Sequence, residues 1–442
     1  MLAATIFIGL ACSSLARTST ANLNMSTTTM AQLGCDATCQ TYFQAGLAAD
    51  VEMFGTGFDP GFYSTASNFT GSAAGDLLKF EAIEPNTVNV ITGTTAYRFQ
   101  YTTRDFERHP RPRHRIDRDS IYFVPTQCKF SRGRLCILHH CWSLLIENGY
   151  AVVAPDYAGL GNNTTLHQYL SLPAHANNLY YAMVAARKAL PHTFISEWMS
   201  VGHSQGGGAV WKLLESELVK TYGAGEPLGT VALAPVSRIY DMTVLTAEAV
   251  LTASNYASYD ITYEALWLPL ALKRVTPGID LSIVSNTFLQ CVDIAELAQV
   301  CYYSIMPLGY GLRPSEIIRN TSALVNNVPF QAGQDAMAPA NGGTLDTPMR
   351  IVQGSNDTDI LPQISVRSFN ASCLSGNEVH MSVYADMDHT DVLKASSPEW
   401  LGFIRDRFER KSTSGRCSVV QHASLDRAHL GTEAESSEDT SL

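Results

Sequence analysis

The sequence predicts an α/β fold, that is, a mostly parallel β-sheet with helices packed on both of its faces. Apolar runs of the kind that form buried parallel strands occupy residues 150–154, 198–201, 229–234, 349–353 and 379–384. Helical patterns lie between or after them, at residues 174–190, from residue 207 onward and at residues 398–410. This alternation of strands and helices is typical of a parallel sheet with helical crossovers.

Composition excludes several classes of protein. The chain has 442 residues, of which 45% are hydrophobic and 16% charged, so it can fill a core and is neither disordered nor collagen-like. Its 41 acidic residues outnumber its 30 Lys and Arg residues, which gives a net charge of −11. A nucleic-acid-binding protein needs a basic surface, so we expect no nucleic-acid partner. Beyond the N-terminus, no run of about 20 apolar residues predicts a transmembrane segment.

The N-terminus has the pattern of a secretory leader. A short apolar run over residues 2–16 ends in Ser14-Leu15-Ala16, so we expect a signal peptide over residues 1–16 and a secreted, extracellular protein. Several Asn-x-Ser/Thr sequons predict a glycoprotein, and ten cysteines predict disulfides in an oxidising compartment. Candidate partners are Cys35 with Cys39, Cys291 with Cys301, and Cys373 with Cys417, with the connectivity left open.

Periodicity divides the rest of the chain into four parts. Residues 17–239 and 344–411 carry the strand and helix patterns, and we expect them to form the two parts of one core. Residues 240–343 are apolar and aromatic with few strand signals, which predicts an inserted helical cap. Residues 412–442 are rich in Ser, Thr and Glu and predict a disordered acidic tail.

A candidate nucleophile lies in Gly202-His-Ser-Gln-Gly206, between a predicted strand and the following helix. Serine at such a sharp turn is held in strained backbone dihedral angles, and only small residues fit two positions away on either side. The turn raises the Ser204 hydroxyl above the sheet edge and directs the N–H of Gln205 toward a substrate oxygen. We therefore expect Ser204 to be the nucleophile, Gln205 an oxyanion donor, and Gly202 and Gly206 the small residues of the elbow. An ordinary tight turn is the alternative.

A serine hydroxyl needs a histidine base, which follows the last strands in the chain order Ser–Asp/Glu–His. His389 lies just past the strand at 379–384, so we expect it to be the base. Asp357 follows the strand at 349–353 and would orient the imidazole and stabilise its cation, with Asp359 as the competing carboxylate. Two other histidines, His203 and His380, are interpreted as packing or structural residues.

Five segments resemble the fungal secretory lipases, a Candida lipase A-like family of the α/β-hydrolase fold. They are Tyr150–Gly161, Tyr169–Asn178, Val201–Gly208, Gly354–Pro362 and Asp386–Leu393, and the similarity covers residues 35–410. The resemblance implies a triad of Ser204, Asp357 and His389 and a helical cap over residues 240–343. It also implies hydrolysis of acylglycerols and other carboxylic esters, with no cofactor. We expect an ester or lipid as the substrate, which can be met at a lipid–water interface, and no metal site.

The sequence departs from that family ahead of residue 149. Family members carry a strand and a His-Gly or similar turn there, which supplies a second oxyanion donor. This chain has only a short, basic stretch over residues 104–140. His140 is the candidate second donor if His139-His140 is a degenerate form of that turn; a real deletion and an error in the gene model are the alternatives. Loss of one oxyanion donor typically lowers the rate by about 10²–10³.

Taken together, these features predict a secreted serine hydrolase that cleaves carboxylic esters through an acyl-enzyme, and most specifically a triacylglycerol lipase. Three alternatives stay open. A short-chain carboxylesterase and a prolyl-aminopeptidase-like peptidase would use the same triad. A catalytically impaired secreted binding protein is the third, because the stretch that should supply the second oxyanion donor is abnormal.

Overall fold

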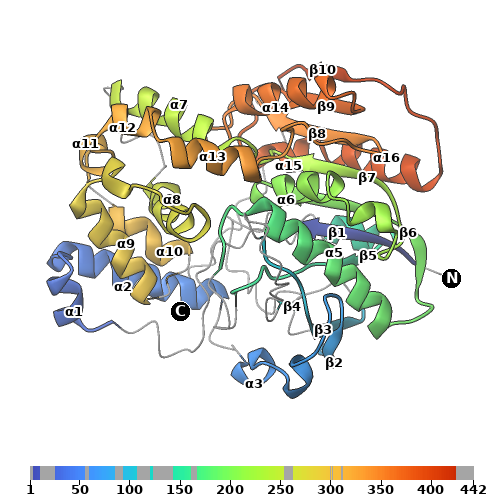
Figure 1. Cartoon of the computed structure of the whole chain (residues 1–442), viewed down its shortest axis with the longest axis horizontal. Helices are drawn as coiled ribbons and strands as arrows, with labels where there is room; N and C mark the ends of the chain where they lie inside the picture. The colour runs from blue at the N-terminus through green and yellow to red at the C-terminus, as the bar shows by residue number, and fades with distance from the viewer. Residues whose placement is uncertain are drawn as a thin grey trace, which may run out of the picture.

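A parallel β-sheet forms the centre of the molecule (Figure 1). The structure is a computed structural model that describes residues 3–9, 25–54, 59–84, 93–106, 120–122, 143–160, 167–252, 262–298, 300, 302–309 and 312–424. Within these residues the sheet has seven strands in the order β10-β9-β8-β7-β6-β1-β5, and all neighbours are parallel. The strands are β1 (Ala3–Gly9), β5 (Ala151–Val153), β6 (Phe194–His203), β7 (Glu226–Leu233), β8 (Met349–Gly354), β9 (Val379–Tyr384) and β10 (Ser418–His422).

Helices cover both faces of this sheet. Adjacent side chains of β6 point to opposite faces, so Trp198 packs in one buried cluster and Met199 packs in another with Trp400. The first face is covered by α5 (Leu172–Ala189), α6 (Gln205–Leu214) and α14 (Pro362–Leu374), and the second by α15 (Asp391–Ala395) and α16 (Ser397–Phe408). The predicted α/β fold class, with helices on both faces of a mostly parallel sheet, is confirmed.

Strand β1 is the last but one strand of the sheet, between β6 and the edge strand β5. Thr5 is opposite Ala151 of β5 on one side and Trp198 of β6 on the other. The sequence predicts a signal peptide over residues 1–16, whose removal would take this strand out of the sheet. The two interpretations compete because a leader and a buried parallel strand share the same short apolar composition.

A small antiparallel sheet, β2-β3-β4, lies beside the parallel one (Figure 1). Its strands are β2 (Leu77–Ile83), β3 (Ala96–Tyr101) and β4 (Ser120–Tyr122), and the short helix α3 (Pro60–Tyr63) precedes them. The last residue of β3, Tyr101, donates a hydrogen bond from its hydroxyl to the carbonyl oxygen of Asn178 at 3.0 Å, which joins this sheet to α5.

The helices that we call the cap come from two stretches, residues 25–54 and 239–337, and lie together on one side of the sheet (Figure 1). Buried side chains from both stretches share one apolar cluster, which includes Phe43 and Trp267. The helices are α1 (Thr27–Gln32), α2 (Ala37–Phe54), α7 (Ile239–Thr252), α8 (Thr262–Val275), α9 (Asn286–Ala298), α10 (Tyr302–Ile305), α11 (Pro314–Ile317), α12 (Thr321–Val325) and α13 (Val328–Met337).

The first cap stretch corrects the domain division predicted from the sequence, which places residues 17–239 in the core. Asp50 of α2 is buried and accepts hydrogen bonds from the N–H groups of Tyr303 and Ser304, at 2.8 and 3.0 Å. A Cβ on Gly46 would lie 2.2 Å from the Tyr303 carbonyl oxygen, so α2 meets the start of α10 at backbone distance. Contacts through small residues leave no strong apolar period, and the sequence therefore hides this helix.

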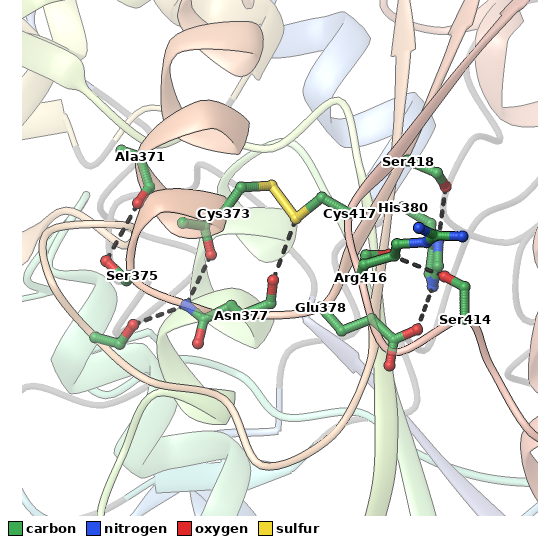
Figure 2. Close-up of a disulfide and its surroundings, with 12 residues drawn as sticks. Ala371, Cys373, Ser375, Asn377, Glu378, His380, Ser414, Arg416, Cys417 and Ser418 are labelled. Carbon is green, nitrogen blue, oxygen red and sulfur yellow. Dashed lines mark hydrogen bonds and ion pairs between the residues drawn. A yellow bond between two sulfur atoms is a disulfide. The ribbon is translucent and has the colours of Figure 1, made fainter.

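A disulfide ties the C-terminal segment to the end of helix α14 (Figure 2). Cys373, near the end of α14, is bonded to Cys417, and β10 begins at the next residue and pairs with β9. This corrects the disordered tail expected over residues 412–442, of which residues 425–442 lie outside the described part. The sequence composition is that of a tail, but the covalent link holds residues 418–422 against the sheet.

Of the other predicted cysteine pairs, one is confirmed. Cys35 and Cys39 form a disulfide. Cys291 is a free thiol, and Cys301, its predicted partner, lies outside the described residues. Among the helices that the structure describes, none combines the length and the apolar composition that a membrane span requires.

Candidate active site

Ser204 stands at the turn between β6 and α6, in a backbone conformation rare for a residue with a side chain. Its φ is 57° and its ψ is −123°. A Cβ on Gly202 would lie 2.1 Å from the Gly206 carbonyl oxygen, which explains why the chain carries glycine at this crossing. The Ser204 N–H donates to Leu233 and its carbonyl oxygen accepts from Val236, both at 2.9 Å, so the end of β7 holds the turn.

His389 and Asp357 form a hydrogen-bonded pair. The Nδ1 of His389 lies 2.8 Å from Oδ2 of Asp357. The Asp357 carboxylate is fully buried, and it also accepts from the side-chain amide of Gln353 at 2.8 Å. Its other oxygen accepts from the N–H groups of Asp359 and Ile360, at 3.0 and 2.8 Å. Four donors, one of them His389 itself, thus stabilise the buried negative charge of Asp357.

This geometry separates the two carboxylates that compete in the sequence. The side chain of Asp357 contacts His389, whereas the contact of Asp359 with the pair is through its backbone N–H. Gln353 is a supporting residue that sequence reasoning missed. Its side-chain amide nitrogen donates to Asp357, and its side-chain oxygen accepts from the Ser365 hydroxyl at 2.6 Å. A residue of β8 thus connects the carboxylate to α14.

The loop that carries His389 lies directly against the turn that carries Ser204. The ring of His203 is 4.3 Å from the ring of His389, measured between centroids. The Nε2 of His203 also lies 3.0 Å from the carbonyl oxygen of His389. The structure therefore brings the candidate base beside the residue that precedes the candidate nucleophile, although the two are far apart in the chain.

His203 is buried, as expected of a packing residue, but it packs against the candidate base rather than away from it. Burial lowers the pKa of His203 well below its usual range, and the nearby His389 lowers it further. The ring is therefore neutral and can donate its Nε2–H to the His389 carbonyl. The Gly-His-Ser motif contains the signal for this role, but only the fold reveals the partner.

Gln205 is the first residue of α6, so its backbone N–H has no partner within the helix and is available at the helix N-terminus. Its side chain is buried and is directed toward α5. His140, the predicted second oxyanion donor, lies outside the described residues. His380 is placed in β9, where its ring contacts Ser418 and Glu378, remote in the sheet from β6.

A cavity of about 140 Å³ opens beside Ser204, between the core and the cap. Its walls are mainly aliphatic and come from cap helices, as Met242 of α7, Leu268 of α8 and Phe288 of α9 illustrate. Ile360 and Asp359 contribute from the loop after β8. Within the described residues, no group of three or more His, Cys, Asp or Glu side chains could hold a metal ion.

Comparison with solved structures identifies the architecture. Candida antarctica lipase A superposes with a TM-score of 0.56 at 14% identity, over 82% of this chain and 89% of that one. The chain has the α/β-hydrolase fold. A rice cell wall degrading esterase from Xanthomonas oryzae superposes with a TM-score of 0.55 at 15% identity, over 77% of this chain and all of the esterase. No protein-family model and no curated protein matches the sequence.

In an α/β-hydrolase the chain order of the functional groups is nucleophile, carboxylate, histidine. Ser204, Asp357 and His389 follow that order and lie after β6, β8 and β9, at the carboxyl ends of parallel strands. Loops at these strand ends form the ligand-binding edge of such sheets. The fold thus accounts for the location of these three residues at one edge of the sheet.

Proposed function

We propose that the protein is a secreted serine hydrolase that cleaves carboxylic esters, with acylglycerols as its substrates. The observation that carries this proposal is the His389–Asp357 pair at 2.8 Å, held beside the strained turn of Ser204. A neutral histidine oriented by a buried carboxylate is the base that a serine hydroxyl requires. The two disulfides support secretion, because such bonds persist in oxidising compartments.

The proposed reaction has two acyl-transfer steps. The Ser204 oxygen attacks the ester carbonyl carbon while Nε2 of His389 takes the hydroxyl proton, and Asp357 stabilises the imidazolium that forms. The N–H of Gln205 donates to the oxyanion, with His140 proposed as the second donor. His389 then gives its proton to the leaving alcohol as the C–O bond breaks. Water, deprotonated by the same base, attacks the acyl-enzyme and releases the acid.

The cavity beside Ser204 favours an acyl chain as the part of the substrate that the protein encloses. Its aliphatic walls would remove apolar surface from water at about 25 cal/mol per Å². Triacylglycerol cleavage is the member of this class that the sequence resemblance supports. Chains that exceed the cavity must extend through its opening or require the cap helices to move.

The size of the cavity favours a second candidate, a short-chain carboxylesterase. Its volume of about 140 Å³ is close to that of an apolar protein cavity of about 150 Å³ that takes up one benzene ring. A six-carbon group therefore fills it. On this candidate the cap is a fixed wall, and esters longer than hexanoate lose rather than gain reactivity.

A serine-directed fluorophosphonate probe tests the proposal. We expect the full chain to be labelled and to hydrolyse nitrophenyl esters, and we expect Ser204→Ala to abolish both. A folded wild-type chain that is neither labelled nor active would contradict the proposal and support a binding protein. A series of nitrophenyl esters from acetate to palmitate, with tributyrin and triolein, then separates a lipase from a short-chain esterase. A proline amide that is cleaved faster than the esters would support a peptidase.

A further inference from the structure

Behind the nucleophile turn, the side chain of Gln205 ends on a buried histidine of α5. The Nε2 of the Gln205 amide lies 2.6 Å from Nε2 of His175. Gln205 is 2% exposed and His175 is 1% exposed. An amide nitrogen can only donate, so the imidazole nitrogen must accept and carries no proton. This bond links α5 to the residue whose backbone N–H is proposed to donate to the oxyanion.

The surroundings of His175 keep the imidazole in that form. The ring of Tyr157 is stacked on it with centroids 3.8 Å apart, and the ring of His167 is nearly parallel to it at 5.6 Å. Burial lowers the pKa of His175 well below its usual range, with a further contribution from His167. The ring is therefore neutral, its plane is set by two neighbours, and its Nε2 lone pair is directed at Gln205.

This arrangement leaves the other ring nitrogen without a partner. With Nε2 as acceptor, Nδ1 carries the proton, and no described residue accepts a hydrogen bond from it. An unpaired buried donor destabilises a fold, and a phenylalanine would fill the same stack without one. The histidine is thus a poor choice for stability alone. Its acceptor toward Gln205 is the feature that phenylalanine lacks.

The strained turn at Ser204 is where the hydrogen bond between Gln205 and His175 has its effect. Ser204 is held at a φ of 57°, and the peptide between Ser204 and Gln205 carries the N–H that an oxyanion would use. Rotation of that peptide would relax the strain and turn the N–H away. A Gln205 side chain anchored on α5 opposes this rotation, because the side chain and the N–H belong to the same residue.

We propose that His175 is a positioning residue that holds the Gln205 N–H in place for the oxyanion. The inference rests on the proposed function, since it assigns a role within that reaction. His175 itself contacts no reacting atom. Misplacing a catalytic group by about 1 Å can lower a rate by up to about 10²-fold, and loss of a whole oxyanion donor by about 10²–10³. We expect the loss of this anchor to fall below those limits, at about tenfold in kcat.

The test uses steady-state hydrolysis of nitrophenyl butyrate by the full chain and its variants. We expect His175→Phe and Gln205→Leu each to lower kcat about tenfold and to leave KM within about twofold, because the lost interaction acts in the transition state. The double variant should be no slower than the slower single variant, since both remove one interaction. His175→Gln, which restores an acceptor near the Nε2 position, should recover most of the rate.

Controls distinguish this role from a structural one. His380→Phe changes a buried histidine far from α6 and should keep the wild-type kcat. The melting temperature of the double variant should equal or exceed that of the wild type, because the unpaired Nδ1 of His175 is gone and neither member of the buried pair is left without its partner. If His175→Phe does not fold, Gln205→Leu examines the same bond from its other end.

Three outcomes would overturn the inference. Wild-type kcat in His175→Phe, or multiplicative losses in the double variant, would show that His175 does not act through Gln205. A loss of kcat that follows the loss of melting temperature across all variants would show a structural role. If the wild-type chain shows no turnover that depends on Ser204, the proposed function fails as well; if it does, only the role of His175 is in question.

Discussion

The Nε2 of His203 donates to the carbonyl oxygen of His389 at 3.0 Å, and the two rings lie 4.3 Å apart. The residue before the candidate nucleophile thus fixes the backbone of the candidate base. This bond joins the last residue of β6 to the loop after β9, so it sets the distance between the turn after β6 and that loop. The local conformation of the turn does not require a histidine at residue 203, but this hydrogen bond to the loop of His389 does.

We therefore expect His203→Phe to lower kcat by about tenfold, because the ring contact remains and the bond to the base loop is lost. KM for a short nitrophenyl ester should change little. Steady-state kinetics at pH 8 with a melting curve checks this. A higher KM at unchanged kcat would place His203 in substrate binding instead.

Replacing the carboxylate should have a larger effect. Asp357→Asn keeps the shape of the side chain but removes the charge that stabilises a protonated His389, and it favours the wrong imidazole tautomer. By analogy with other triads we expect kcat to fall by about 10⁴-fold. Asp391→Asn, on the exposed first turn of α15, is the matched control and should retain activity. A loss below tenfold in Asp357→Asn would argue for another carboxylate as the partner.

Acid should destabilise the fold through His167. Burial lowers the pKa of this histidine from 6.5 to about 4. The unfolded chain takes up the proton below pH 6.5 and the folded chain only below about 4. Between these values the free energy of unfolding falls by about 1.4 kcal/mol for each pH unit, and above pH 6.5 the full stability is present. We expect His167→Phe to flatten the dependence of melting temperature on pH between 6.5 and 4.5; an unchanged slope would contradict the assignment.

The disulfide between Cys373 and Cys417 closes a loop with a sequence separation of 44. In the chain-entropy picture, such a loop contributes about 4 kcal/mol to the free energy of unfolding. Replacing both cysteines with alanine should lower stability by up to that amount while kcat stays near the wild type, since β10 is at the sheet edge far from β6. Denaturant titration measures the change. A fall in kcat that accompanies the fall in the free energy of unfolding would show that the edge strand β10 supports the site.

The placement of β1 makes a prediction about the mature N-terminus. If residues 3–9 form the strand between β6 and the edge strand β5, a chain that begins at residue 17 lacks the backbone partners of β5 and β6 on their facing sides. We expect that chain to be insoluble or strongly destabilised. Mass spectrometry of the secreted protein gives the natural N-terminus. A stable, active chain that begins near residue 17 would show that the segment is a removable leader.

The candidate catalytic residues could be predicted from the sequence because each follows a recognisable buried strand. Ser204, Asp357 and His389 are local features in that sense: the strand ends are visible in composition, and chemistry narrows the choice. The supporting contacts could not be predicted. Gln353 and His203 act through partners that only the assembled sheet brings near, and a single sequence carries no record of such pairs.

Other differences have equally specific causes. The apolar composition of residues 3–9 fits a secretory leader and a buried strand equally well. α2 meets α10 through Gly46 at backbone distance, so it lacks the large apolar stripe that reveals a helix. The segment after residue 417 has the composition of a tail and pairs with β9 next to a covalent link to α14. In each case a long-range partner decides the structure.

The dual origin of the cap limits how this fold can be re-engineered. The helix α2 is bound to α10 through Asp50. A chimaera that exchanges only residues 239–337 would therefore leave α2 next to a helix that does not match it. Grafting a new cap would require two segments to be exchanged together, residues 25–54 between β1 and β2 and residues 239–337 between β7 and β8. Specificity and N-terminal sequence are therefore expected to change together when this scaffold is diversified.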